Sequence, residues 1–318
     1  MNKQNDIDID QLMSHGYYEE YTKAVNPLYS GKIKKVPFKH FASHIHETGP
    51  SKIHPLDISQ ELECDGPATS PGLCANFVRI LKNENVKANF NATSQLIYII
   101  KGSGWSQHDN LTIPWHQGDF VVLPIGKNIT HHAHEETAMY LIHDEPLLRY
   151  LGAEANYAKF KPTLYTSENS LLELNRVQKE AEAKNRSRIS VILINEASDQ
   201  TQTVTHTLWA MLGILPKGSS QLPHRHQSVA LDLILDCNEG CYTLVGDTID
   251  QEGKIVNPTR IDWQANSAFI TPPGLWHAHF NESSEDVNFI PIQDAGLHIF
   301  LRSLDIKFVL PNQAIPSP

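Results

Sequence analysis

Two stretches near the C-terminal end decide the fold: Gly218-Ser-Ser-Gln-Leu-Pro-His-Arg-His226 and Pro272-Pro-Gly-Leu-Trp-His-Ala-His-Phe-Asn281. Side chains two positions apart on an extended strand point to the same side, so His224 and His226 share a face. His277, from the second stretch, can complete one face of a metal site. Three neutral imidazoles suit iron, copper, zinc or nickel and leave coordination positions open. The pattern predicts a metal-dependent catalyst on a β-barrel.

The two stretches match, residue by residue, the two motifs of the cupin superfamily, G-x5-H-x-H and P-x-G-x2-H-x3-N. Asn266 stands where the second motif usually opens with glycine, and Ala230 and Leu231 occupy the places expected for a glutamate ligand. The stretch from His224 to Leu235, together with Gly240-Cys-Tyr-Thr-Leu-Val245, resembles the metal-binding cupin of gentisate and 1-hydroxy-2-naphthoate dioxygenases, which hold their metal with three histidines and no carboxylate. The resemblance implies a bicupin that holds Fe(II), with Mn, Zn and Ni as alternatives, at His224, His226 and His277.

The bulk composition is that of an ordinary globular protein. The chain has 318 residues, of which 40% are hydrophobic and 19% charged, and its net charge of -10 makes nucleic acid an unsuitable partner. No apolar run approaches the ~20 residues that a membrane helix needs. The first residues lack the apolar core of a signal peptide, and four cysteines do not make a disulfide scaffold. We therefore expect a cytoplasmic protein with no membrane partner.

The distribution of short β-rich runs predicts an all-β protein of two cupin (jelly-roll β-barrel) domains. The expected divisions are an N-terminal arm over 1–70, cupin domain 1 over 71–155, a linker over 156–187 and cupin domain 2 over 188–318. The linker should contain a helix that starts at Ser167 or its neighbour Thr166, because apolar residues recur there at helical spacing.

The first half is an imperfect repeat of the second. When residues 89–104 are laid over the His224 segment, Asn89 and Asn91 replace the two ligand histidines. The second motif keeps its glycines and proline, but its next histidine, His131, comes two positions late. Because asparagine is a poor ligand in a site built on imidazole, we predict that the first barrel has lost its metal.

His131 belongs to a cluster with His132 and His134, which follows the loop-like stretch Gly126-Lys-Asn-Ile-Thr. No H-x-H pair faces this cluster within the first half of the chain. A surface loop is the favoured interpretation, and a second metal site is the alternative.

Two residues near the predicted metal are candidate catalytic groups. His279 follows His277 by two positions and projects to the same side, where it could contact substrate or orient a ligand. A solvated histidine at the barrel rim is the alternative. Asp232 lies six positions after His226 and could orient a ligand histidine or take a proton from the substrate. The alternative interpretation is that Asp232 lies at the end of a strand and is exposed to solvent.

Arg302 and Trp276 are the candidate substrate-binding residues. A carboxylate substrate would need a cation, which Arg302 can supply through a paired hydrogen bond. Trp276 could wall an apolar pocket, although aromatic residues of small barrels more often belong to the core.

The leading hypothesis is an Fe(II)-dependent dioxygenase that acts on a small oxygenated substrate, and the resemblance favours a hydroxylated aromatic acid. The substrate would chelate at the three-histidine site, and dioxygen would be the second reactant. One rival is a non-oxidative metal-dependent cupin enzyme, such as an isomerase, decarboxylase or aminohydrolase. The other is a cupin that binds a small molecule without turnover, since a fold alone does not fix a function. The resemblance also implies a homodimer or homotetramer.

Overall fold

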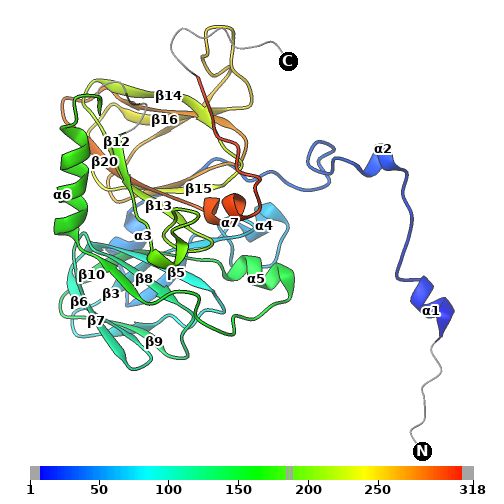
Figure 1. The fold of residues 1–318 in the computed structure, drawn as a ribbon, viewed down its shortest axis with the longest axis horizontal. Helices are drawn as coiled ribbons and strands as arrows, with labels where there is room; N and C mark the ends of the chain where they lie inside the picture. The colour runs from blue at the N-terminus through cyan, green and yellow to red at the C-terminus, as the bar shows by residue number, and fades with distance from the viewer. Residues whose placement is uncertain (1–7, 184–185, 187–188, 310–318) are drawn as a thin grey trace, which may run out of the picture. The chain divides into compact units, whose positions relative to one another are not determined.

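The computed structural model describes residues 8–183, 186 and 189–309. The predicted domain boundary at residues 187–188 thus lies outside the described residues. Residues from Val36 onward form one compact unit that contains two β-barrels, whereas Met1–Lys35 form a separate unit (Figure 1). The all-β fold predicted from the sequence is confirmed.

The first barrel is built from a six-stranded sheet and a four-stranded sheet. In spatial order, the larger sheet contains β11 (Thr163–Tyr165), β8 (Phe120–Pro124), β5 (Ser94–Lys101), β10 (Thr137–His143), β3 (Cys74–Ile80) and β2 (Lys52–Pro55). The smaller sheet contains β4 (Asn85–Lys87), β9 (Ile129–Ala133), β6 (Ser103–His108) and β7 (Leu111–His116). Every strand pairing in this barrel is antiparallel.

The second barrel repeats this plan with a six-stranded and a five-stranded sheet. The larger sheet contains β1 (Lys39–Phe41), β18 (Ala268–Thr271), β15 (Ala230–Ile234), β20 (Val287–Gln293), β13 (Trp209–Leu215) and β12 (Ile189–Ile192). The smaller sheet contains β17 (Thr259–Asp262), β16 (Cys241–Gly246), β19 (Trp276–Asn281), β14 (Ser219–Arg225) and β21 (Lys307–Phe308). The predicted metal-binding stretches therefore lie on adjacent strands, β14 and β19.

One hydrophobic core joins the two six-stranded sheets. It includes Phe77 and Tyr140 from the first barrel with Leu231 and Ile270 from the second. Because these sheets are covered on both faces, all seven residues of β3 and all seven of β10 are buried. Strands buried on both faces tend to be continuous apolar runs instead of alternating ones, as residues 138–142 of β10 show, whereas β3 also buries the polar side chains of Asn76 and Arg79.

The interiors of the two barrels differ in what fills them. Fourteen buried hydrophobic residues form the interior core of the first barrel. Only seven form that of the second, among them Trp263, Phe269 and Phe289. Among the described residues, the second barrel therefore leaves interior space for polar side chains and a ligand, whereas the first is filled mainly by apolar side chains, with Ser106 and His131 buried among them.

Residues 36–70, predicted to be part of an arm, contribute strands to both barrels. β1 pairs with β18 at one edge of the second barrel, and β2 pairs with β3 at one edge of the first. Two short helices, α3 (His44–Glu47) and α4 (Ser59–Leu62), lie in the same segment. The buried guanidinium of Arg79 donates hydrogen bonds to the carbonyls of His46, Glu47 and Gly49, which fixes the turn after α3. The separate segment is thus shorter than the sequence suggested.

The predicted linker helix is α6 (Ser167–Gln178), and Thr166 caps it by accepting a hydrogen bond from the backbone N–H of Asn169. Leu174 is buried on its inner face. Other helical segments among the described residues are α5 (Glu145–Leu151), η2 (Glu196–Ser198) and α7 (Ala295–Phe300).

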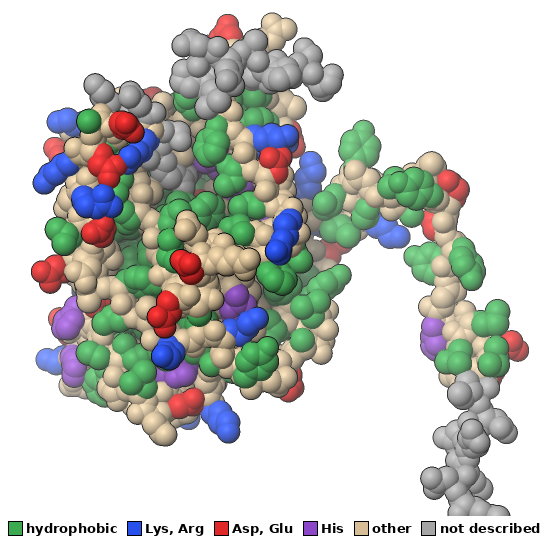
Figure 2. All heavy atoms as spheres, in the orientation of Figure 1, with side chains coloured by type: hydrophobic (Ala, Val, Ile, Leu, Met, Phe, Trp, Pro, Cys, Tyr) green, Lys and Arg blue, Asp and Glu red, His purple; other side chains and the backbone are tan. Residues whose placement is uncertain are grey.

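The N-terminal unit consists of two short helices, α1 (Ile9–Met13) and α2 (Tyr21–Ala24), and has no buried residue in either helix. Its large hydrophobic side chains are exposed, as the green atoms along this segment in Figure 2 show. Among them, Tyr18 and Tyr29 are almost fully accessible. None of the helices in the described residues has the length and apolar character to span a membrane.

The buried histidines of the first barrel should make the protein sensitive to acid. Burial lowers the pKa of His131 to about 4 and that of His143 to about 3, from an ordinary value of 6.5. The unfolded chain therefore binds these protons first, and the free energy of unfolding falls as pH drops from about 7 to about 4. His131 alone should account for about 3 kcal/mol of this loss.

Urea denaturation of the metal-free protein at pH 7, 5.5 and 4.5 would measure this effect. His131→Leu should flatten the dependence on pH, whereas Ile129→Val should lower stability equally at each pH because it removes no titrating group. An unchanged pH dependence in His131→Leu would contradict the assignment.

Candidate metal centre

Four buried histidines converge inside the second barrel, two from each of the predicted stretches. The pairing of β14 with β19 places His224 directly opposite His277, next to a register shift in β14. Their ring centroids are 4.0 Å apart, and the ring of His226 lies 4.9 Å from that of His277. All three residues predicted as metal ligands are thus neighbours in the barrel interior.

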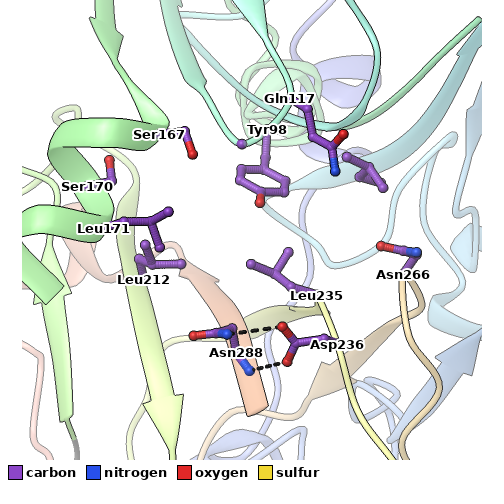
Figure 3. A pocket seen from close by; sticks show the side chains of 12 residues that line it. Tyr98, Gln117, Ser167, Ser170, Leu171, Leu212, Leu235, Asp236, Asn266 and Asn288 are labelled. Carbon is purple, nitrogen blue, oxygen red and sulfur yellow. Dashed lines mark hydrogen bonds between the residues drawn. The ribbon is translucent and has the colours of Figure 1, made fainter. Parts of the chain in front are cut away.

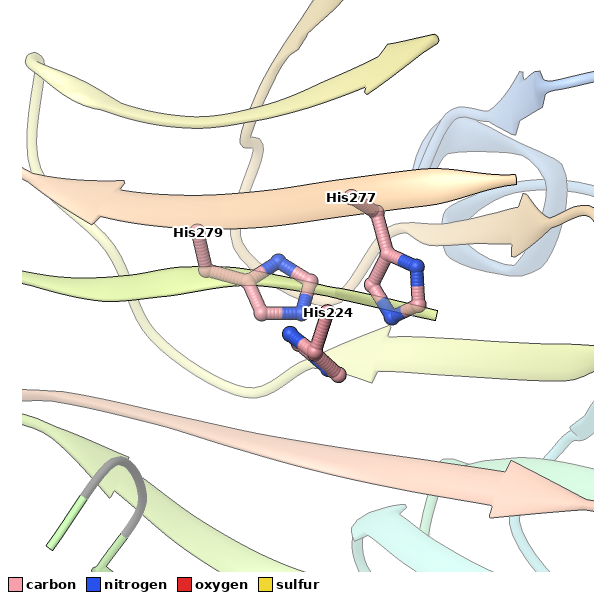
Figure 4. Close-up of side chains that lie close together, drawn as sticks. All are labelled: His224, His277 and His279. Atoms are coloured by element: carbon pink, nitrogen blue, oxygen red, sulfur yellow. The ribbon is translucent and has the colours of Figure 1, made fainter. Parts of the chain in front are cut away.

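The most compact group within the described residues is His224, His277 and His279 (Figure 4). One ring nitrogen from each lies within 4.8 Å of the others. His279 therefore stands among the imidazoles and is buried, so the alternative of a solvated rim histidine is wrong. His226, which was predicted as a ligand, lies beside this group, with its ring centroid 6.2 Å from that of His224.

Backbone carbonyls hold the Nδ1 atoms of three of these histidines. The Nδ1 of His224 lies 3.1 Å from Leu222 O, and that of His277 lies 3.1 Å from Leu275 O. The Nδ1 of His226 lies 2.8 Å from the carbonyl oxygen of Ser228. Since a carbonyl can only accept, each Nδ1 carries the hydrogen and each lone pair is on Nε2. This is the arrangement that metal-binding histidines require, so the donor set fits a metal ion.

His279 has a different environment from the other three. Its Nδ1 lies 2.8 Å from the Thr243 hydroxyl, which also accepts a hydrogen bond of 2.8 Å from the indole of Trp263. The rings of Phe269 and Phe289 lie on the same side of the barrel, at centroid distances of 6.4 and 5.5 Å from the His279 ring. His279 thus lies between the other imidazoles and the aromatic core.

The glycines and asparagines of the motifs shape the turns that carry the histidines. Gly218 and Gly274 have φ values of +64° and +75°, a region that residues with a Cβ rarely adopt. The N–H of Gly274 also donates a 2.7 Å hydrogen bond to the carbonyl of His226, which ties the two motifs together. Asn266, found in place of the usual glycine, has φ +58°, and asparagine tolerates this region better than most residues.

The last residue of the second motif, Asn281, closes the turn after β19. Its amide donates to the carbonyls of Leu215 and Glu285, and its Oδ1 accepts from the backbone N–H of Ser283. The Asn281 side chain and the bond to Leu215 are buried, so this amide supplies a hydrogen bond that water cannot reach to provide.

Asp232 is buried on β15, on the same face of the strand as the core residue Ile234. Its Oδ2 accepts a 2.7 Å hydrogen bond from the hydroxyl of Thr271. The alternative of a solvent-exposed strand end is therefore wrong. Asp232 contributes no atom to the compact group of three histidines.

The two candidate substrate-binding residues lie outside the cavity described below. Arg302 follows α7 on the surface, where its guanidinium contacts the carbonyl and ring of Phe300. Trp276 lies at the start of β19, and the guanidinium of Arg225 lies 5.3 Å from its ring centroid. No motif places Arg302, whereas Trp276 directly precedes His277 on β19, so that its side chain projects to the face of the strand opposite the histidines.

A cavity of about 230 Å³ adjoins the histidines. His224 and His226 form part of its wall, and the rest is a mixture of apolar and uncharged polar residues: Ser190, Ile192, Trp209, Met211, Gln221, Gln293, Ile306 and Phe308. No lysine or arginine is among the described residues of this wall. Trp209 is one of several aromatic residues that could have been expected to wall an apolar pocket, whereas nothing in the sequence indicated Ser190, because the motifs place only the metal ligands.

A larger cavity of about 310 Å³ lies elsewhere, lined by residues of both barrels and of α6 (Figure 3). Tyr98 points into it, and Asp236 is held there by two hydrogen bonds from Asn288. No histidine lines this cavity among the described residues, so it offers no metal site of the kind seen in the second barrel.

The first barrel contains a counterpart of His279 without the other three histidines. Ser106 is opposite His131 in the first barrel as Thr243 is opposite His279 in the second. The Ser106 hydroxyl lies 2.8 Å from His131 Nδ1 and accepts a hydrogen bond from the indole of Trp115. His131 is therefore buried on a strand, and the surface-loop interpretation is wrong for it.

The other two histidines of that cluster pack on an aromatic ring. The ring of His132 stacks on Trp105 at a centroid distance of 4.7 Å, and His134 contacts the same indole at 4.9 Å. Within the part of the chain that the structure describes, these histidines form no group able to hold a metal.

Comparison with known proteins finds sequence similarity to a dioxygenase over part of the chain. No known family profile matches it. A segment of 103 residues is 29% identical to gentisate 1,2-dioxygenase 1 of Aquipseudomonas alcaligenes and covers 32% of this chain. That segment spans 26%, about a quarter, of the length of the relative.

Similarity to solved structures extends over almost the whole chain. Salicylate 1,2-dioxygenase from Pseudaminobacter salicylatoxidans matches with a TM-score of 0.70 and 11% identity, over 94% of this chain and 96% of that one. A mutant of that enzyme in complex with gentisate gives a TM-score of 0.70 and 12% identity, over 96% and 97%. An oxalate decarboxylase matches more weakly, with a TM-score of 0.51 and 12% identity over 81% and 76%. The chain therefore has the bicupin fold, similar to that of salicylate 1,2-dioxygenase, as its two motifs predict.

Proposed function

We propose that this protein is a metal-dependent dioxygenase that cleaves a small hydroxylated aromatic compound, with Fe(II) as its metal. The observation that carries the proposal is the set of buried imidazoles with anchored Nδ1 atoms beside a largely apolar cavity of about 230 Å³. The partial identity to a gentisate dioxygenase supports the same reaction class.

The proposed ligands are His224, His226 and His277, each through Nε2. His224 and His226 both line the cavity, so a metal held by them would face the substrate. His279 and His131 have equivalent partners, since each contacts a hydroxyl that accepts a hydrogen bond from an indole. His131 has these partners although the first barrel lacks the other imidazoles. This repeated arrangement is therefore an element of the fold, and His279 is proposed to orient or protonate groups near the metal.

When bound, Fe(II) supplies Lewis acidity toward substrate oxygens and the electron transfer that dioxygen chemistry needs. The protein itself provides a largely apolar surface beside the histidines, formed by Trp209, Met211 and Phe308, against which the ring of the substrate can pack. We propose that Asp232, which accepts a hydrogen bond from the Thr271 hydroxyl, orients a ligand histidine or takes a proton from the substrate.

A non-oxidative cupin enzyme, such as an isomerase, decarboxylase or aminohydrolase with Mn, Zn or Ni, is the second candidate function. The similarity to an oxalate decarboxylase concerns the fold alone. The histidine-only donor group favours the dioxygenase, because many non-oxidative cupins add a carboxylate ligand, and none is in that group within the described residues. A cupin that binds a small molecule without converting it is the third candidate function.

The identity of the ligands can be tested by metal binding. His224→Gln, His226→Gln and His277→Gln should each abolish tight binding of Fe(II) in anaerobic titration calorimetry. His279→Gln should weaken it by at most about 10- to 100-fold, as expected for a residue that only orients the ligands. His131→Gln in the first barrel is the matched control and should have no effect. Loss of binding in His279→Gln with retention in His226→Gln would instead assign the metal to the compact trio.

The reaction class can be tested by oxygen consumption. The anaerobically loaded Fe(II) protein should take up one equivalent of dioxygen per substrate with a member of a panel of hydroxylated aromatic acids, catechols and β-dicarbonyls. His277→Ala should abolish the uptake. Product formation without oxygen in the Mn or Zn protein would favour the non-oxidative class, and tight ligand binding without product would favour the binding class.

We also propose a cytoplasmic homodimer or homotetramer. The four cysteines are unpaired, which agrees with a reducing compartment, and the exposed hydrophobic residues of 8–35 are suited to burial against another chain. Light scattering should give a multiple of the chain mass of 35.8 kDa, and removal of residues 1–35 should reduce it. A full-length protein that is monomeric at micromolar concentration would contradict the assembly.

A further inference from the structure

Two hydrogen-bond donors in the wall of the metal-side cavity have no partner among the described residues. They are the indole Nε1 of Trp209 and the hydroxyl of Ser190. Both atoms are buried, although part of each side chain reaches the surface. A buried donor without an acceptor costs about 1–3 kcal/mol, so a pair of them in one cavity indicates that a ligand supplies the acceptor.

The two donors lie on the wall opposite the metal ligands. His224 is on β14 of the five-stranded sheet, whereas Ser190 on β12 and Trp209 on β13 belong to the six-stranded sheet of the same barrel. A ligand that reaches from the histidines across the cavity therefore presents its far side to these donors.

Trp209 is positioned by the same network that anchors a metal ligand. Its cross-strand partner on β20 is Gln293, whose Oε1 accepts a hydrogen bond from the Ser228 hydroxyl. That hydroxyl lies 3.0 Å from the Nδ1 of His226. The indole is thus fixed relative to the histidines by neighbouring strands and not by a flexible loop.

Ser190 reaches the interior because its cross-strand neighbour on β13 is a glycine. A Cβ on Gly213 would lie 2.7 Å from the Ser190 Oγ and 3.3 Å from the ring of Phe289. The missing side chain therefore leaves the space that the hydroxyl occupies. Any larger residue at 213 would push the hydroxyl from this place.

Resting on the proposed function, we propose that Trp209 and Ser190 form a distal subsite that receives an oxygen acceptor of the substrate. An indole N–H can only donate, so the group that binds it must be a carbonyl, nitro, carboxylate or hydroxyl oxygen. The substrate class is thus an aromatic ring with two adjacent oxygens for the metal and a further oxygen-bearing substituent across the ring. Ile192 and Met211 between the donors accommodate only the apolar body of such a ring.

Indole NMR observes the proposed hydrogen bond without any turnover. The Zn(II)-loaded protein, labelled with ¹⁵N-tryptophan, would be titrated with 4-nitrocatechol and with 4-ethylcatechol, which is similar in shape but has no distal acceptor. Trp209→Phe assigns the resonance. The Trp209 N–H should shift downfield with 4-nitrocatechol only. The indoles of Trp115 and Trp263, already bonded to Ser106 and Thr243, are internal references that should not shift.

Affinity measurements with the same two probes complete the test. The preference for 4-nitrocatechol over 4-ethylcatechol should fall about 2- to 10-fold in Trp209→Phe and in Ser190→Ala, the usual worth of one hydrogen bond. Gly213→Ala should act like Ser190→Ala, because it displaces the same hydroxyl.

An unshifted Trp209 resonance, an unchanged preference in these variants, or no binding of either probe to the Zn(II) protein would overturn the subsite. Failure of the dioxygenase proposal has a different signature. In that case the Fe(II) protein consumes no oxygen, while the indole shift and the altered preference are still observed.

Discussion

The candidate site depends on one strand pairing, that of β14 with β19. This pairing puts His224 opposite His277, and the shift of register in β14 brings His226 close to the same ring. The hydrogen bond from the N–H of Gly274 to the carbonyl of His226 connects the residues that follow β14 to the turn that precedes β19. If these two strands slipped by one residue, every imidazole would turn to the outer face, because successive side chains on a strand alternate between faces.

The two barrels act as an internal comparison for the role of each residue. Both contain a tryptophan, a hydroxyl and a histidine in the same relative positions on paired strands. In the first barrel, Asn89 replaces a ligand histidine, and its side-chain oxygen accepts a hydrogen bond from the backbone N–H of Ile129. Ile129 occupies the position that His277 has in the second barrel. Apart from the shared hydroxyl and histidine, the first interior is filled mainly by apolar side chains, whereas the second retains a cavity beside its histidines. The difference between the barrels is thus one of a few side chains within a common framework.

The sequence was sufficient for the parts that local chemistry determines. The glycines with positive φ, the histidine spacing and the Thr166 cap of α6 each follow from the conformation of a few consecutive residues. These features predicted the bicupin fold and the strands that carry the histidines.

Features that depend on distant pairing could not be predicted in this way. The burial of His279 and His131 depends on how far along the barrel axis each strand extends, which neighbouring residues do not encode. The incorporation of residues 36–70 into both barrels depends on the edges of β18 and β3. The cavity wall formed by Ser190 and Trp209 likewise depends on the pairing of β12 with β13 across a glycine.

The central claim is that imidazoles from β14 and β19 share one metal ion inside the second barrel. Anomalous diffraction from crystals of the metal-loaded protein, recorded at the absorption edge of the bound metal, tests it most directly. The account predicts a single strong peak at about 2.1 Å from the Nε2 atoms of His224, His226 and His277. A peak beside the first-barrel histidines instead, or well-ordered imidazoles with no peak between them, would contradict it.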